Sequence, residues 1–240
     1  NNSIKNHRYN NLISEAYDLP EDFYEKRKIG QNDGLFCRFI QNDLVKDFII
    51  YVNMNNISIA KTTINLSIYE TNSFLLMKKS PTLIEYAAFY GSIQIFRYLL
   101  MNNAELSPSL WLYAIHGNNP DIIHLLEDMH ITPNLKCLKE SFKCFNNEIS
   151  NYLINNYFFD KRIEYSLCAL KCYNFLFVDY KNADMFSMNL WCKYDFPLFV
   201  DILIKTNGID FRYSILKIIL LSQINFEIKQ FNNILYCNFL

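Results

Sequence analysis

The amino-acid sequence predicts an all-α protein made of about seven stacked helix-turn-helix units. Two observations predict this class. Glycine and proline are scarce, with 5 and 6 occurrences in 240 residues, which disfavours a turn-dense β-sandwich or barrel. A sequence motif also recurs every 27 residues, and a repeat of this kind is typical of units that stack on one another and share a continuous core.

The repeat is clearest in three consecutive segments, residues 83–100, 110–127 and 137–154. At a shift of 27 residues, Ala87 aligns with Ala114 and Leu99 with Leu126. Apolar residues recur at spacings of three and four in each half of a segment, which predicts two short helices. The polar break between the two helices is expected at Gly91, Asn118 and Asn146.

The rest of the chain divides around these three units. Weaker copies of the motif cover residues 35–52, 164–181, 187–204 and 216–233. Residues 53–79 separate the first unit from the second and are expected to be an insertion with one extra helix. Residues 1–29 are polar with mixed charge, so we expect an N-terminal cap segment there, followed by a repeat domain over residues 30–240.

Helix starts are marked by residues that can cap free backbone amides. Hydroxyl-proline pairs precede three first helices, at Ser80-Pro81, Ser107-Pro108 and Thr132-Pro133. The second helices are expected to open at Asp43, Ser92 and Asn119. The side chains expected in the shared core are Ile95, Tyr98, Leu99, Ile122, Leu125 and Leu126.

The unit at residues 82–105 resembles an ankyrin repeat. Thr82 matches the conserved threonine of that family, Ala87-Ala88 match its alanine pair, and Gly91 matches its glycine between the helices. Glu85 replaces the ankyrin histidine that bonds between repeats. The spacing of 27 residues is also shorter than the usual repeat of about 33, so the β-turn fingers are expected to be short or absent.

Over about residues 26–210 the chain resembles the divergent, expanded ankyrin-repeat proteins of parasitic unicellular eukaryotes. The resemblance implies an ankyrin-type solenoid whose concave face binds another protein. The residues at the corresponding positions are Gln41, Asn42, Phe89, Tyr90, His116, Lys143, Lys193 and Tyr194. Each also lies just before a turn, so the alternative is that these residues only end their helices.

The sequence contains no motif for catalysis or for a cofactor, such as a glycine-rich phosphate loop, HExxH or GxSxG. His116, His124 and His130 lie close in sequence but on different expected elements, so they are not expected to bind a metal. Cys168 and Cys172 are expected to be packing residues. The formal net charge of -1 does not favour nucleic acid, and no apolar stretch reaches the roughly 20 residues of a membrane span.

The sequence therefore predicts a non-enzymatic scaffold for protein-protein interaction. The alternative is a substrate-recruitment segment of a larger enzyme whose catalytic domain lies outside this chain. Seven cysteines without short paired spacings, and no signal peptide at the start, predict a cytoplasmic location, with the nucleus as the alternative. The identity of the partner and the oligomeric state do not follow from the sequence.

Overall fold

The computed structural model describes residues 19–78 and 80–178, together with Trp191, Lys193, Tyr194, Phe196, Leu198, Asp201 and Lys205. Within these residues the secondary structure is helical, apart from one isolated antiparallel bridge between Thr63 and Thr82. The all-α class is confirmed there, and none of the helices in this part of the chain could span a membrane. The expected units at 187–204 and 216–233 lie outside the continuous described ranges.

The chain divides into two units, Asn1–Tyr157 and Phe158–Leu240. In the first unit, α2 (Phe23–Ile29) precedes a series of helix pairs. The pairs are α3 (Leu35–Gln41) with α4 (Val45–Met54), α6 (Leu83–Tyr90) with α7 (Ile93–Met101), α8 (Leu110–Gly117) with α9 (Pro120–Asp128), and α10 (Leu135–Lys143) with α11 (Asn147–Leu153). A further helix, α5 (Ser73–Lys78), lies between the first two pairs in sequence.

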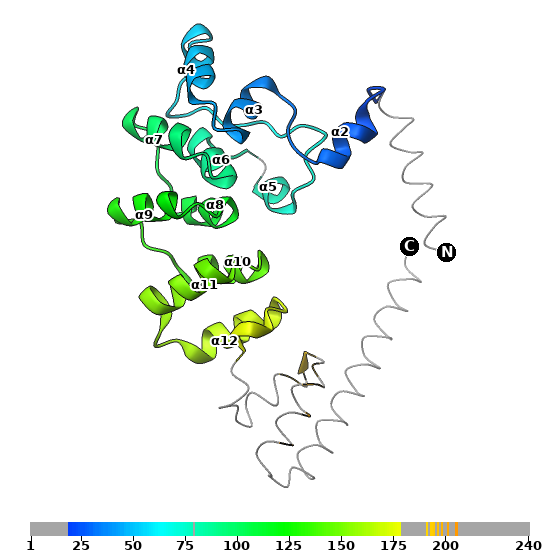
Figure 1. Cartoon of the computed structure of the whole chain (residues 1–240), viewed down its shortest axis with the longest axis vertical. Helices are drawn as coiled ribbons and strands as arrows, with labels where there is room; N and C mark the ends of the chain where they lie inside the picture. Colours follow the sequence, from blue (N-terminus) through cyan, green and yellow to red (C-terminus); the bar gives the residue numbers. More distant parts are fainter. Residues whose placement is uncertain are drawn as a thin grey trace, which may run out of the picture. The chain divides into compact units, whose positions relative to one another are not determined.

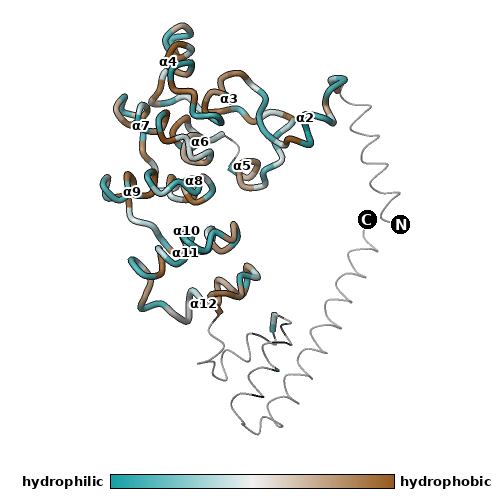
Figure 2. The backbone as a smooth tube through the Cα atoms, viewed as in Figure 1, coloured by the Kyte–Doolittle hydropathy of each residue, from teal (hydrophilic) through white to brown (hydrophobic). Residues whose placement is uncertain are grey.

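Each helix pair packs against the next pair along the chain (Figure 1). The first helices contact one another in the order α3, α6, α8, α10, and the second helices in the order α4, α7, α9. In α7 and α9 hydrophilic residues lie between the buried apolar ones (Figure 2), as expected for helices that bury one face, whereas α6 and α8 bury most of their residues. Neighbouring pairs therefore supply the surface that each pair needs to cover its apolar side.

The apolar side chains expected in the core are found there. Ile95, Leu99, Ile122 and Leu126 are fully buried, while Tyr98 and Leu125 are half-buried. Among the described residues, Trp111 on α8 is the largest fully buried side chain, and its indole nitrogen donates to the carbonyl oxygen of Ile131. Burial of one large apolar side chain contributes roughly 1.5–3 kcal/mol, so this packing between pairs stabilises the first unit.

Backbone conformation repeats with the same period as the sequence. A residue in the left-handed conformation lies in the turn inside each pair, at Asp43, Gly91, Asn118 and Phe145. Another lies in the turn after three of the pairs, at Asn56, Asn103 and His130. The expected break at Asn146 is thus displaced by one residue: Phe145 makes the turn, and Asn146 is the N-cap of α11, accepting a hydrogen bond from the amide of Ile149 at 3.4 Å.

Gly117 permits a close approach between α6 and α8. A Cβ atom at position 117 would lie 2.0 Å from the carbonyl oxygen of Ala88 and 2.8 Å from the backbone nitrogen of Gly91. Both neighbours are backbone atoms, which cannot rotate away as a flexible side chain would. The contact between these two first helices therefore requires glycine at this position.

The first helices begin later than the hydroxyl-proline pairs predict. The N-caps of α6, α8 and α10 are Thr82, Ser109 and Asn134. Thr82 and Asn134 have extended backbone conformations, and their side chains accept hydrogen bonds from amides in the first turn. The prolines therefore lie just before the N-cap and not at the first helical position.

Polar side chains connect successive pairs. Glu85 completes a capping box with Thr82, and its other carboxylate oxygen accepts hydrogen bonds from the hydroxyls of Ser107 and Ser109 at 2.8 and 2.7 Å. Asp43 was expected to open α4, but Leu44 is the N-cap of that helix, and the Asp43 carboxylate binds the first turn of α7. Glu85 and Asp43 thus both accept hydrogen bonds from the next helix pair, and Glu85 also caps the first helix of its own pair.

In the second unit, α12 (Arg162–Lys171) is followed by a 3-10 turn (Phe175–Phe177). The sequence predicted two helices in residues 164–181, and within the residues described here only the first is a regular α-helix. The last helix of the first unit, α11, continues into a π-helical turn (Ile154–Phe158) that ends at the first residue of the second unit and that the apolar spacing did not indicate.

Candidate functional site

Six of the eight residues expected on the binding face lie in the first unit, at the C-terminal ends of the first helices. Gln41 ends α3, Tyr90 ends α6, Lys143 ends α10, and His116 lies in the last turn of α8. This common position follows from the repeat, because each residue falls just before the left-handed residue that turns the chain into its second helix. The expected binding face is thus formed by the ends of four first helices, α3, α6, α8 and α10.

The first part of this face is a chain of contacts between α3 and α6. The Gln41 amide nitrogen donates to the Tyr86 hydroxyl at 3.0 Å and to the carbonyl oxygen of Asn32 at 2.9 Å. The rings of Tyr86 and Tyr90 lie 4.9 Å apart, centroid to centroid. Burial raises the pKa of Tyr90 to about 12 and that of Tyr86 further, so both hydroxyls remain protonated at neutral pH.

Phe89 continues the row toward α8. Its ring lies 5.1 Å from that of Tyr90, and it stacks on the His116 ring, also at 5.1 Å. Phe74 of α5 packs onto the same place, with its ring centroid 4.3 Å from His116 and 6.1 Å from Phe89. The insertion therefore covers part of the expected binding face with one of its own side chains.

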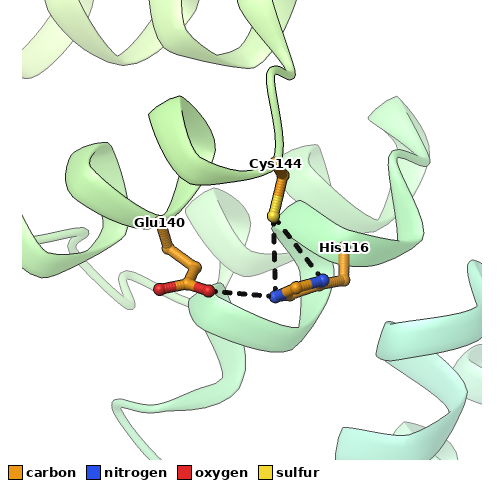
Figure 3. A group of neighbouring side chains, drawn as sticks. All are labelled: His116, Glu140 and Cys144. Carbon is orange, nitrogen blue, oxygen red and sulfur yellow. Dashed lines mark hydrogen bonds and ion pairs between the residues drawn. The ribbon is translucent and has the colours of Figure 1, made fainter. Parts of the chain in front are cut away.

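His116 joins α8 to α10 through a polar cluster (Figure 3). Its Nε2 atom lies 3.2 Å from Oε1 of Glu140, and Lys143 donates to the other carboxylate oxygen at 2.9 Å. The hydrogen bond with His116 lowers the pKa of Glu140 to about 2, with a further contribution from Lys143 and against the opposing effect of burial. Glu140 is therefore a carboxylate throughout the physiological range.

Cys144 completes this cluster. Its Sγ atom lies 3.6 Å from both ring nitrogens of His116, above the face of the ring in Figure 3. The donor atoms of His116, Glu140 and Cys144 all lie within 4.8 Å of one another. Among the residues described, this is the one group of three or more such side chains close enough to share a metal ion.

An open groove of about 770 Å³ adjoins the cluster. Its lining combines the ends of α8 and α10 with the start of α11 and is rich in amide side chains. The lining residues are Ile115, His116, Asn118, Lys143, Cys144, Phe145, Asn146, Asn147 and Glu148. The groove gives a ligand or partner access to His116 and Lys143.

The three other expected residues are Asn42, Lys193 and Tyr194. Asn42 is exposed at the end of α3, and its side chain donates to the carbonyl oxygen of Arg38 on its own helix at 2.8 Å. Lys193 and Tyr194 belong to the second unit, where the Lys193 ammonium lies 5.9 Å from the centre of the Tyr194 ring.

The three histidines considered as metal ligands occupy separate surroundings. His116 belongs to the cluster with Glu140, His124 lies 3.3 Å from the carboxylate of Glu127, and His130 is the exposed left-handed residue of a turn. The sequence reasoning missed Glu140 and Cys144 as neighbours of His116. Their spacing of four residues, at the end of the same helix, is the signal that could have indicated a shared helix face.

Glu127 forms a second polar cluster. The hydroxyls of Tyr152 and Tyr157 donate to it at 2.7 and 2.6 Å. Burial alone would raise the pKa of Glu127, but these hydrogen bonds, together with that of His124, lower it below its usual value. Beside this cluster, α9 and α11 border a cleft of about 230 Å³ that includes Ile123 and Tyr152.

Residues 101–189 match the profile of a family described as a domain of unknown function (DUF3447). The matched range includes His116, Glu140 and Cys144. No ankyrin family is among the matches. Comparison with curated proteins and with solved structures gives no match.

Proposed function

We propose that this chain is a non-enzymatic scaffold, an ankyrin-type solenoid that binds another protein along the ends of its first helices. The observation that carries this proposal is the first-helix row: Gln41, Tyr86, Tyr90, Phe89, His116, Glu140 and Lys143. These side chains touch one after another across α3, α6, α8 and α10. Tyr86 is fully buried and supports the row from inside, while the other members are half-buried or exposed and provide an extended surface with aromatic rings and charge, as protein interfaces require.

Three features support the solenoid part of the proposal. Helix pairs contact the next pair in order, and the left-handed turns recur with the spacing of the sequence repeat. Glu85, at the position of the ankyrin histidine, accepts hydrogen bonds from Ser107 and Ser109 of the next pair. A carboxylate in this position thus makes a bond between units, as the histidine does in the family that the chain resembles.

The contact with Phe74 narrows the proposed binding surface. Phe74 is 5% exposed and packs on Phe89 and His116, so these rings offer a partner only their remaining edges. Tyr90 is half-buried, Lys143 is exposed, and the groove beside Asn146 and Asn147 is open. We therefore assign the main partner contacts to Tyr90, Lys143 and the groove.

A pull-down from a lysate of the source cell tests this surface. The double variant Tyr90→Ala with Lys143→Ala should lose a protein that the wild-type chain recovers, because it removes an aromatic anchor and a charge. Met101→Ala is the matched control: Met101 is 76% exposed and lies on α7, a second helix. Circular dichroism melts would show that both variants are folded.

Equal recovery by the wild type and the double variant would contradict the proposed face. Failure of the folded wild-type chain to recover any specific protein would contradict the scaffold function itself. Loss of the partner with Met101→Ala would move the interface to the second helices.

A further inference from the structure

We propose that His116, Glu140 and Cys144 form a binding site for a zinc-like divalent cation. The inference is independent of the scaffold function and rests on the three side chains drawn in Figure 3. They supply one imidazole nitrogen, one carboxylate oxygen and one sulfur, a donor set that zinc accepts and that magnesium and calcium do not prefer.

Two of the three distances between the donor atoms suit a tetrahedral ion, and the third, between Glu140 and Cys144, is within 4.8 Å. With metal-ligand bonds of about 2.0–2.3 Å, neighbouring donors in such a site lie about 3.3–3.7 Å apart. Nε2 of His116 lies 3.2 Å from Oε1 of Glu140 and 3.6 Å from Sγ of Cys144. The sulfur lies over the ring face, so it must swing toward Nε2 when the ion enters. The thiol then releases its proton to solvent, and the imidazole takes the tautomer with its proton on Nδ1, which frees Nε2 for the ion.

Two of the three ligands are held by neighbouring groups. The His116 ring is stacked against Phe89 and packed by Phe74, which fixes its plane. Lys143 holds Oε2 of Glu140, which leaves Oε1 directed at His116. Such supporting contacts orient metal ligands, and here they are present before the ion binds.

The site is partly shielded and open on one side. The side chains of His116 and Glu140 are 15% and 13% exposed. The groove of about 770 Å³ includes both His116 and Cys144 in its lining, so water or a partner side chain can supply a fourth ligand. Three protein ligands with one open position is an arrangement that zinc adopts in proteins.

Cobalt spectroscopy on the purified, chelator-treated chain tests the proposal directly. Co²⁺ should produce visible d–d bands and a thiolate-to-cobalt charge-transfer band in the near ultraviolet, and Zn²⁺ should remove both by displacement. Cys144→Ser should abolish the charge-transfer band. Cys172→Ser is the matched control, since Cys172 is the C-cap of α12 as Cys144 is of α10, and it should keep the full spectrum.

Two further measurements keep the proposal testable if a variant folds poorly. Zn²⁺ but not Mg²⁺ should raise the melting temperature of the wild-type chain, and His116→Gln should remove that increase. In the wild type, Zn²⁺ should slow alkylation of Cys144 by iodoacetamide, measured by mass spectrometry, while Cys172 reacts unchanged. A charge-transfer band that persists in Cys144→Ser, a wild type without the band, or alkylation of Cys144 unaffected by zinc would each overturn the site.

Discussion

The carboxylate of Asp43 accepts a hydrogen bond from the backbone amide of Ile95, 52 positions later in the chain, at 2.9 Å. Its other oxygen accepts from the amide of Gln94 at 3.0 Å. These are amides of the first turn of α7, whose own N-cap residue, Ser92, makes no capping bond. Ser92 instead donates to the carbonyl oxygen of Ile40. A turn residue of the first helix pair thus caps a helix of the second.

Replacing Asp43 by alanine should lower the free energy of unfolding by about 1–2 kcal/mol, because two amides of α7 lose their acceptor. Asp47→Ala is the control, since Asp47 is exposed in the first turn of α4. Its loss should have a smaller effect, about 0.5 kcal/mol. Urea unfolding of the three proteins measures both values, and equal destabilisation would show that the cap between pairs contributes nothing.

Replacing Gly117 by alanine should destabilise the first unit by about 3 kcal/mol, because the new methyl group would overlap the carbonyl oxygen of Ala88. Gly34→Ala provides the comparison, since a Cβ atom there would lie 3.3 Å from a side-chain oxygen of Asn32. That change should stay within about 1 kcal/mol of the wild type. Thermal melts would contradict the prediction if the two variants behaved alike.

Phe145 has a left-handed backbone with φ 53, a conformation that is unfavourable for a bulky residue. Its side chain is 58% exposed, so little packing is lost on truncation. We expect Phe145→Gly to be more stable than Phe145→Ala by about 1 kcal/mol, since only glycine relieves the backbone strain. The comparison between the two variants separates the backbone from the side chain, and the reverse order in urea unfolding would refute this account.

Glu127 should make the free energy of unfolding of the first unit depend on pH in the acid range. Its pKa is lowered in the folded chain, so its contribution to stability is fully present above the unfolded value of about 4.3. That contribution is lost as the pH falls through the lower, folded pKa. Glu127→Gln should therefore lower stability at pH 7 by about 1–2 kcal/mol, and the difference from the wild type should shrink in acid.

Urea unfolding between pH 7 and pH 3 measures this difference. Glu148→Gln is a suitable control, because Glu148 is an exposed carboxylate on the neighbouring helix α11. A difference between wild type and Glu127→Gln that stays constant over this range would show that the tyrosine hydroxyls do not favour the ionised carboxylate.

The helical class could be predicted because it depends on local patterns. The apolar spacing in residues 83–127 placed Ile95, Leu99 and Ile122 on buried faces, and all three are buried. The hydrogen-bond partners of the capping side chains could not be predicted from the sequence. Asp43 and Ser92 both carry side chains that can cap a helix, but Asp43 accepts from the amide of Ile95 and Ser92 donates to the carbonyl oxygen of Ile40, and both partners depend on how two helix pairs stack.

The candidate site, too, could be predicted only in part from the sequence. The family resemblance selected Phe89, Tyr90, His116 and Lys143, and the structure connects them in one row; their role in binding stays a prediction. Phe74 could not be anticipated, because the insertion that carries it does not follow the repeat. Glu140 and Cys144 meet His116 only once α10 is packed on α8.

The insertion before α6 also has a consequence for the order of folding. Neighbouring pairs meet through residues about one repeat apart, such as Gly91 and Asn119, which lie 28 positions apart and form a hydrogen bond. Short separations of this kind favour rapid folding. The hydrogen bond from the amide of Ile95 to Asp43 closes a loop of 52 positions, almost twice as long, and each doubling adds about 0.6 kcal/mol to the entropic barrier. We therefore expect α6 to α11 to associate early and the first pair, with its insertion, to dock later.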